Sequence, residues 1–174
     1  MKELKDYVRS IPDFPEPGII FRDVTTILQD ADGLHLAVDL LLEQLENLDY
    51  DAIVGPESRG FIFGVPVAYA GRKSFVPVRK AGKLPCETLS MEYELEYGSA
   101  TIEIHKDAIK PGQKIVIIDD LLATGGTVET VIKMVEALGG QVVKLCFVME
   151  LCGLSGRERL KGYEVGSIIK YDGK

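Results

Sequence analysis

The chain has 174 residues and a net charge of −7, and hydrophobic and charged residues make up 46% and 27% of it. These values are typical of one globular domain, here expected to span residues 1–174, and the acidic balance argues against a nucleic-acid partner. No apolar run is long enough to span a membrane, so we expect no membrane partner. Three cysteines without a CxxC pattern indicate neither a disulfide framework nor a zinc site, which favours a reducing cytoplasm.

The first half of the chain alternates between helix and strand patterns. Apolar residues recur at helical spacing over 34–48, with Asp32 as a candidate N-terminal cap. Residues 51–55 form a short apolar run that ends in glycine and predicts a buried strand. Residues 60–70 are apolar throughout and predict a buried helix, and a further strand is predicted over 74–78.

The second half continues this alternation. Residues 81–98 contain glycines, a proline and mixed charge, and predict a long loop excursion. The run 100–105 predicts a half-exposed strand, and the β-branched run 115–118 predicts a central parallel strand. Residues 128–138 have the spacing of an amphipathic helix, and 142–149 that of another strand. The pattern predicts an α/β fold with a central, mostly parallel sheet flanked by helices.

The charge is unevenly distributed along the chain. Between Ser58 and Cys86 there are six basic residues and no acidic one, although the chain as a whole is acidic. Such a run alone is more typical of a solvated basic surface, with an anion-binding site as the alternative. The sequence of this segment alone leaves both interpretations open.

The most informative string is VIIDDLLATGGT, from Val116 to Thr127. A buried strand ends in Asp119 and Asp120, and a short loop of small residues then opens a helix, at the edge where open α/β sheets bind ligands. Backbone amides of such a loop form a phosphate-binding nest, which we expect to consist of Ala123, Thr124, Gly125, Gly126 and Thr127. The two carboxylates would repel a phosphate and suit sugar hydroxyls or Mg²⁺. The string therefore predicts a phosphorylated sugar as ligand.

Three other interpretations fit these strings less well. A tight turn with a helix cap explains TGGT alone, but not the preceding pair of carboxylates. In a phospho-acceptor receiver domain the paired acids lie near the chain start and no phosphate loop follows them. Residues 55–60 have the glycine spacing of a P-loop, but Phe61 and Ile62 stand where that motif needs lysine and a hydroxyl residue.

The 119–127 string resembles the motif by which type I phosphoribosyltransferases bind 5-phosphoribosyl-1-pyrophosphate (PRPP). Four further strings are similar to the adenine branch of that family and follow in its order: FRD at 21–23, ESRGF at 57–61, RKAGKLP at 79–85 and LEYG at 95–98. The resemblance implies the type I fold, with a small hood contributed by about 1–30 and 150–174. It also implies a flexible lid loop within 81–98 and a homodimer.

The resemblance implies transfer of the 5-phosphoribosyl group from PRPP to N9 of adenine, which gives AMP and pyrophosphate. The nest would bind the 5′-phosphate, and Asp119 and Asp120 would bind the ribose and stabilise an oxocarbenium-like transition state. Mg²⁺ is the implied cofactor, held through substrate and water with Asp119 or Asp120 as a further candidate ligand. The residues implied for pyrophosphate are Arg59, Arg79, Lys80, Lys83 and Tyr97.

Base recognition is also implied by the resemblance. Phe21 and Leu151 would cover the two faces of adenine, although each residue taken alone is more typical of a core position. The extended backbone of Ile20, Phe21 and Arg22 offers an N–H and a C=O that match N1 and N6 of adenine, whereas guanine and hypoxanthine present the reverse pattern. Glu96 would bind near N7 as the acid/base residue, unless it lies on a solvated strand face.

Two alternative functions remain at this point. One is a phosphoribosyltransferase for another base, such as hypoxanthine-guanine or xanthine, against which the FRD and LEYG strings argue. The other is a PRPP-sensing regulator that binds the sugar phosphate without turnover. Such regulators usually add a DNA-binding domain or a basic RNA-binding face, and this acidic chain has little beyond one α/β domain.

Overall fold

The computed structural model describes residues 2–94 and 98–173. Its main sheet has seven strands in the order β5-β6-β4-β3-β7-β8-β9. The five strands at the centre and one edge are mutually parallel: β4 (Ser74–Lys80), β3 (Ala52–Pro56), β7 (Lys114–Leu122), β8 (Gln141–Leu151) and β9 (Val165–Tyr171). This architecture confirms the predicted α/β fold with a mostly parallel sheet.

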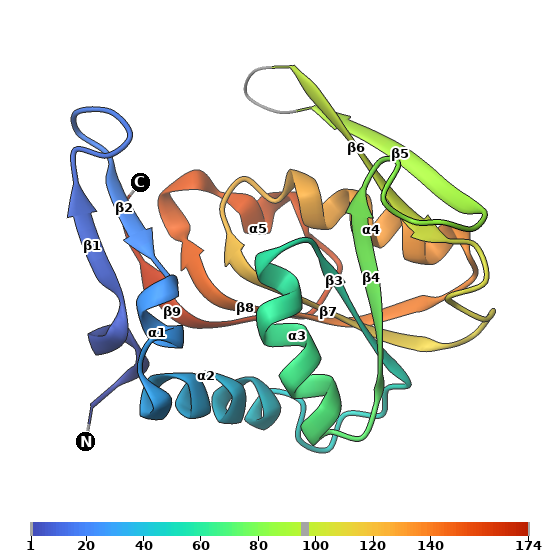
Figure 1. Cartoon of the computed structure of the whole chain (residues 1–174), viewed down its shortest axis with the longest axis horizontal. Coiled ribbons are helices and arrows are strands. Elements are labelled where there is room, and N and C mark those ends of the chain that lie inside the picture. Colours follow the sequence, from blue (N-terminus) through green and yellow to red (C-terminus); the bar gives the residue numbers. More distant parts are fainter. Residues whose placement is uncertain (1, 95–97, 174) are drawn as a thin grey trace.

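Two antiparallel hairpins lie at opposite ends of the molecule (Figure 1). At one end, β5 (Thr88–Glu94) pairs with β6 (Ser99–His105), and β6 continues the main sheet beside β4. At the other end, β1 (Arg9–Pro12) pairs with β2 (Ile20–Asp23) as a separate two-stranded sheet. The second hairpin lies near the C-terminal strand of the main sheet, so segments from both ends of the sequence meet there.

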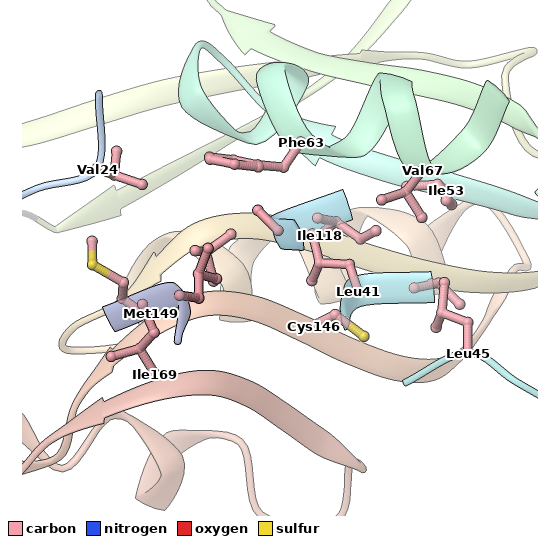
Figure 2. Packing of buried hydrophobic residues seen from close by; sticks show 14 of the residues in the cluster. Val24, Leu41, Leu45, Ile53, Phe63, Val67, Ile118, Cys146, Met149 and Ile169 are labelled. Carbon is pink, nitrogen blue, oxygen red and sulfur yellow. The ribbon is translucent and has the colours of Figure 1, made fainter. Parts of the chain in front are cut away.

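The helices cover both faces of the main sheet. Along β7, Val116 and Ile118 pack into one apolar cluster with residues of α2 (Ala31–Glu43) and α3 (Arg59–Ala70). The alternate residues Ile115 and Ile117 pack into a second cluster with α4 (Gly126–Ala137). All four side chains are fully buried, as expected for a central parallel strand. Figure 2 shows the first cluster, in which Leu41, Phe63 and Ile118 meet.

Short helical segments connect these elements. They are η1 (Leu4–Tyr7), α1 (Thr25–Leu28), η2 (Cys152–Leu154) and α5 (Gly156–Arg159).

None of the helices in the described part of the chain is long and apolar enough to cross a membrane. All three cysteines carry free thiols.

Helix α2 begins two residues earlier than the sequence predicts. Its N-terminal cap is Asp30 rather than Asp32, because the Asp30 carboxylate accepts hydrogen bonds from the N–H groups of Asp32 and Gly33. The helix also ends at Glu43, before the last leucines of the periodic run. Leu45 lies in the turn that follows and still reaches the core, whereas Leu48 lies just after that turn.

Two further predictions are wrong in part. The predicted excursion over 81–98 contains a regular strand, since β5 pairs along its whole length with β6. Its side chains alternate, and Leu89, Met91 and Tyr93 pack against the second apolar cluster. Helix α3 is buried on one side only, because large apolar side chains on its other side are exposed: Ile62, Val65 and Tyr69.

Candidate active site

A cavity of about 200 Å³ opens beyond the carboxyl ends of β3 and β7. Strand β7 is followed directly by the loop into α4, and β3 by the start of α3, so two segments about sixty residues apart form one site. The cavity is lined by Arg59 and by residues 119–128. It thus brings together eight predicted site residues: Arg59, Asp119, Asp120, Ala123, Thr124, Gly125, Gly126 and Thr127.

The two carboxylates lie within the last four residues of β7, which continues to Leu122, two residues past the predicted end at Asp120. Asp120 is 3% exposed, and its Oδ2 lies 3.0 Å from Nε of Arg59. Burial raises the pKa of Asp120 and Arg59 opposes this rise. Burial and the neighbouring charge of Asp120 raise the pKa of Asp119 well above its ordinary value. A bound cation or a developing positive charge would therefore be stabilised here.

The loop between β7 and α4 has the geometry of a phosphate nest. Gly125 adopts a left-handed backbone conformation with φ of 84°, which glycine allows without steric cost. Among the described residues, no protein acceptor takes a hydrogen bond from the N–H groups of Thr124, Gly125 or Gly126. These groups lie at the N-terminal, positive end of the twelve-residue helix α4. The loop can therefore bind an anion such as a phosphate group.

Three of the other predicted pyrophosphate residues, Arg79, Lys80 and Lys83, gather around Glu57, a carboxylate that was not among the predicted site residues. Its Oε1 accepts a hydrogen bond of 2.7 Å from the Lys80 N–H and lies 3.4 Å from Nε of Arg79. Its Oε2 lies 3.0 Å from Nζ of Lys83. Burial would raise the pKa of Glu57, but the hydrogen bonds from Lys80 and Lys83 lower it overall. Glu57 therefore holds the end of β4 and the turn that follows it beside the start of α3, outside the lining of the cavity.

The signal for Glu57 was present in the sequence, because this residue is part of the ESRGF string. Its partners lie more than twenty residues further along the chain. Only the parallel pairing of β3 with β4 brings them together, with Pro56 opposite Val78. The pairing could not be read from the string itself.

The predicted adenine-binding residues lie on the β1–β2 hairpin and at the end of β8. Ile20, Phe21 and Arg22 are extended in β2, as the sequence predicts. The Arg22 side chain is engaged elsewhere, since it donates to Ser10 Oγ and lies 4.1 Å from the ring centroid of Tyr171. Leu151 is the last residue of β8 and is partly buried.

None of these hairpin residues lines the cavity at the phosphate nest. Phe21 makes an edge-on contact with Phe14, whose ring centroid is 5.3 Å away and whose side chain is half exposed. Phe14 was not among the predicted site residues. Two predicted residues, Glu96 and Tyr97, lie outside the described residues.

Comparisons with known proteins agree with this geometry. The model of the family described as "Phosphoribosyl transferase domain" matches residues 24–171. Adenine phosphoribosyltransferase of Lachnoclostridium phytofermentans is 69% identical over 174 residues, which cover 100% of both chains. The crystal structure of adenine phosphoribosyltransferase from Thermoanaerobacter pseudethanolicus superposes with a TM-score of 0.92 at 53% identity, covering 97% of this chain and 98% of that one.

A third similar protein was solved with ligands. It is adenine phosphoribosyltransferase of Saccharomyces cerevisiae, complexed with D-2,5-dideoxy-2,5-imino-altritol 1,6-bisphosphate and adenine. Its TM-score is 0.88 at 41% identity, and the match covers 95% of this chain and 96% of that one. The full-length similarity, the matching fold and the nest beside Asp119 and Asp120 all agree. The chain therefore belongs to the phosphoribosyltransferase family, and within it to the adenine phosphoribosyltransferases.

Proposed function

We propose that the chain transfers the 5-phosphoribosyl group of PRPP to N9 of adenine, releasing pyrophosphate and forming AMP. The observation that carries this proposal is the pair of carboxylates, of which Asp120 is almost fully buried, beside an anion-binding loop in one cavity. A phosphate nest alone would fit many ligands, whereas adjacent carboxylates add a site for sugar hydroxyls. The family membership established above identifies the reaction in which such a ligand is used.

Each part of PRPP has a complementary group in the site. The nest would bind the 5′-phosphate through its N–H groups, and Asp119 and Asp120 would accept hydrogen bonds from the ribose hydroxyls. Arg59 would bind the pyrophosphate, together with Arg79 and Lys80 at the end of β4 and Lys83 just after it. The ion pair between Arg59 and Asp120 supports this assignment, because ribose and pyrophosphate are joined at C1 and need neighbouring sites.

The carboxylates also suit the expected transition state. As the bond from C1 to pyrophosphate breaks, positive charge develops on the ribose and negative charge grows on the leaving group. Asp119 and Asp120 face the first of these charges, and Arg59 faces the second. No step needs a covalent bond to the enzyme, so no nucleophilic side chain is required.

Mg²⁺ fits the donor set of the cavity. Apart from its ion pair with Arg59, the buried Oδ2 of Asp120 accepts no hydrogen bond from the residues described. No cluster of three or more potential metal ligands occurs in the ranges 2–94 and 98–173, so substrate and water oxygens would complete the coordination. When bound, Mg²⁺ would neutralise charge on the pyrophosphate.

Adenine would bind below a hood formed by about 1–30 and 150–174, between Phe21 and Leu151. The extended conformation of β2 supports reading of the base edge by backbone groups of 20–22. Glu96 and Tyr97 stay predictions, as acid/base residue and pyrophosphate contact respectively. They follow β5, whose last residue Glu94 has its carbonyl oxygen near Gly126, which supports a lid role for this hairpin.

A homodimer is part of the proposal. Helix α3 exposes Ile62, Val65 and Tyr69, and Tyr69 is 87% exposed. An adjacent groove of about 320 Å³ between α2 and α3 is lined mainly by apolar groups, including Val38, Leu42 and Pro66. A contiguous apolar surface of this kind is typical of a subunit contact. A cytoplasmic location, expected from the cysteine usage, also stays a prediction.

The testing experiment is a PRPP-dependent turnover assay with Mg²⁺, in which adenine, hypoxanthine, guanine and xanthine are offered separately. AMP from adenine, with little product from the other bases, is the expected result. Product from another base would contradict the specificity and leave the PRPP site intact. Tight PRPP binding without turnover of any base would instead identify a sensor.

A further inference from the structure

The segment that contains α5 lies directly against the phosphate nest. A Cβ atom at Gly156 would lie 2.3 Å from the carbonyl oxygen of Ala123 and 2.9 Å from Cδ1 of Leu122. A Cβ atom at Gly125 would lie 2.9 Å from the carbonyl oxygen of Gly156. The two backbones are therefore in contact, with no room for a side chain on either glycine.

This contact indicates the direction in which an N–H group of the nest points. The carbonyl oxygen of Ala123 faces Gly156, and in a planar trans peptide the N–H group points opposite to the C=O group. The N–H of Thr124 therefore points away from α5. The segment touches the carbonyl side of the loop and leaves its N–H side open to the cavity, where a phosphate would bind.

An ion pair between the partly exposed Arg157 and the buried Glu150 fixes the position of the segment. Nε and Nη2 of Arg157 lie 2.6 Å and 2.7 Å from the two carboxylate oxygens of Glu150, which is 4% exposed. The same guanidinium donates to the carbonyl oxygen of Val165 at 3.0 Å and to Oγ of Ser167 at 3.3 Å. Arg157 thus joins α5 to both β8 and β9.

The proposed reaction involves neither the guanidinium of Arg157 nor the carboxylate of Glu150. Burial would raise the pKa of Glu150, but hydrogen bonds from Arg157 and Ser167 lower it, so the carboxylate stays ionised at neutral pH. A bidentate pair fixes both position and orientation of the guanidinium, which a single contact would not. Arg157, whose side chain is held in this way, directly follows Gly156 in the chain.

We propose that Gly156, Arg157 and Glu150 are positioning residues for the 5′-phosphate: the ion pair holds α5 against the carbonyl side of the nest, so that its N–H groups converge on one phosphate. This inference rests on the proposed function, since it assumes that the nest binds that phosphate. It predicts that loosening the contact weakens affinity for the phosphorylated sugar and spares recognition of the base.

The test measures binding of ribose 5-phosphate by calorimetry, together with the KM values for PRPP and adenine, in Gly156→Ala, Arg157→Lys and Glu150→Gln. Gly156→Ala is expected to weaken ribose 5-phosphate binding and raise the KM for PRPP at least about tenfold. Arg157→Lys and Glu150→Gln, which remove the bidentate pairing, should each weaken binding at least about threefold. The KM for adenine should stay within about twofold of wild type.

The control variant is Glu158→Gln, which removes an exposed ion pair with Lys161 from the same segment and should change none of these values. Circular dichroism verifies folding, and Arg157→Lys keeps the test decisive if Gly156→Ala does not fold. Folded variants that bind ribose 5-phosphate as wild type does, or that lose PRPP and adenine affinity equally, would overturn the inference. No binding of ribose 5-phosphate by the wild-type chain would contradict the proposed phosphate site as well.

Discussion

Arg59 and Asp120 lie 61 positions apart in the sequence, yet Nε of the first is 3.0 Å from Oδ2 of the second. The carboxylate is almost fully buried, whereas the guanidinium is partly exposed at the mouth of the cavity. Arg59 thus opposes the desolvation of Asp120 while its outer face stays available to an anion. One side chain links the expected sugar and pyrophosphate sites.

We expect Arg59→Gln to lower kcat/KM at least about tenfold, equivalent to about 1.4 kcal/mol, because a cation facing the leaving group is lost. Arg59 also lowers the pKa of Asp120, so its removal should raise that pKa further. The acid limb of the pH profile of kcat/KM should then move to higher pH if the ionised carboxylate is needed. An unchanged profile would contradict a role of Asp120 in its ionised form.

Asp119→Asn should reduce activity at least about tenfold and stabilise the ligand-free fold. Burial and the Asp120 charge raise the folded-state pKa above the ordinary value of 3.8, so the unfolded chain releases this proton more readily. The carboxylate therefore costs stability as pH rises above 3.8, and asparagine should raise Tm by roughly 2 °C or more at pH 7. This gain in Tm should vanish below pH 3.8, where Asp119 is protonated in both the folded and the unfolded chain. Thermal unfolding across this pH range measures it, and a lower Tm at pH 7 would contradict the argument.

Glu57→Gln should strengthen inhibition by pyrophosphate about threefold. Glu57 attracts Lys83 and Arg79, which the proposed function assigns to pyrophosphate, and glutamine removes that competing charge. The side-chain oxygen of glutamine can still accept the Lys80 N–H, so the loop should stay in place. Product-inhibition kinetics give the result, with Glu87→Gln, which removes an exposed ion pair with Lys106, as control. Unchanged or weaker inhibition would show that Glu57 does not compete.

Tyr69→Asp should convert a dimer into monomers, because it places a charge in the exposed apolar face of α3. Sedimentation velocity compares this variant with wild type and with Lys106→Asp, which changes the charge of an exposed site outside the α2–α3 groove. A wild-type chain that sediments as a monomer, or a Tyr69→Asp variant that still dimerises, would contradict the proposed contact.

The part of the site that could be predicted from sequence is the part that is local in the chain. Strand, carboxylates, nest and helix follow one another from 116 to 137, so their order alone predicts the geometry. Glu57 and Gly156 were missed because their partners are distant in sequence and are brought close only by strand pairing and by packing of α5. Strand β5 was missed because glycine and proline flank its alternating pattern.

The contact between Gly125 and Gly156 has a consequence for synthesis of the chain. During translation, the nest residues are synthesised about thirty positions before the segment that packs against them. Val165 and Ser167, which accept hydrogen bonds from Arg157, are synthesised later still. A nascent chain that has reached Gly140 would carry the complete PRPP string without its support. Full affinity for the sugar phosphate would therefore arise late, when β9 joins the sheet.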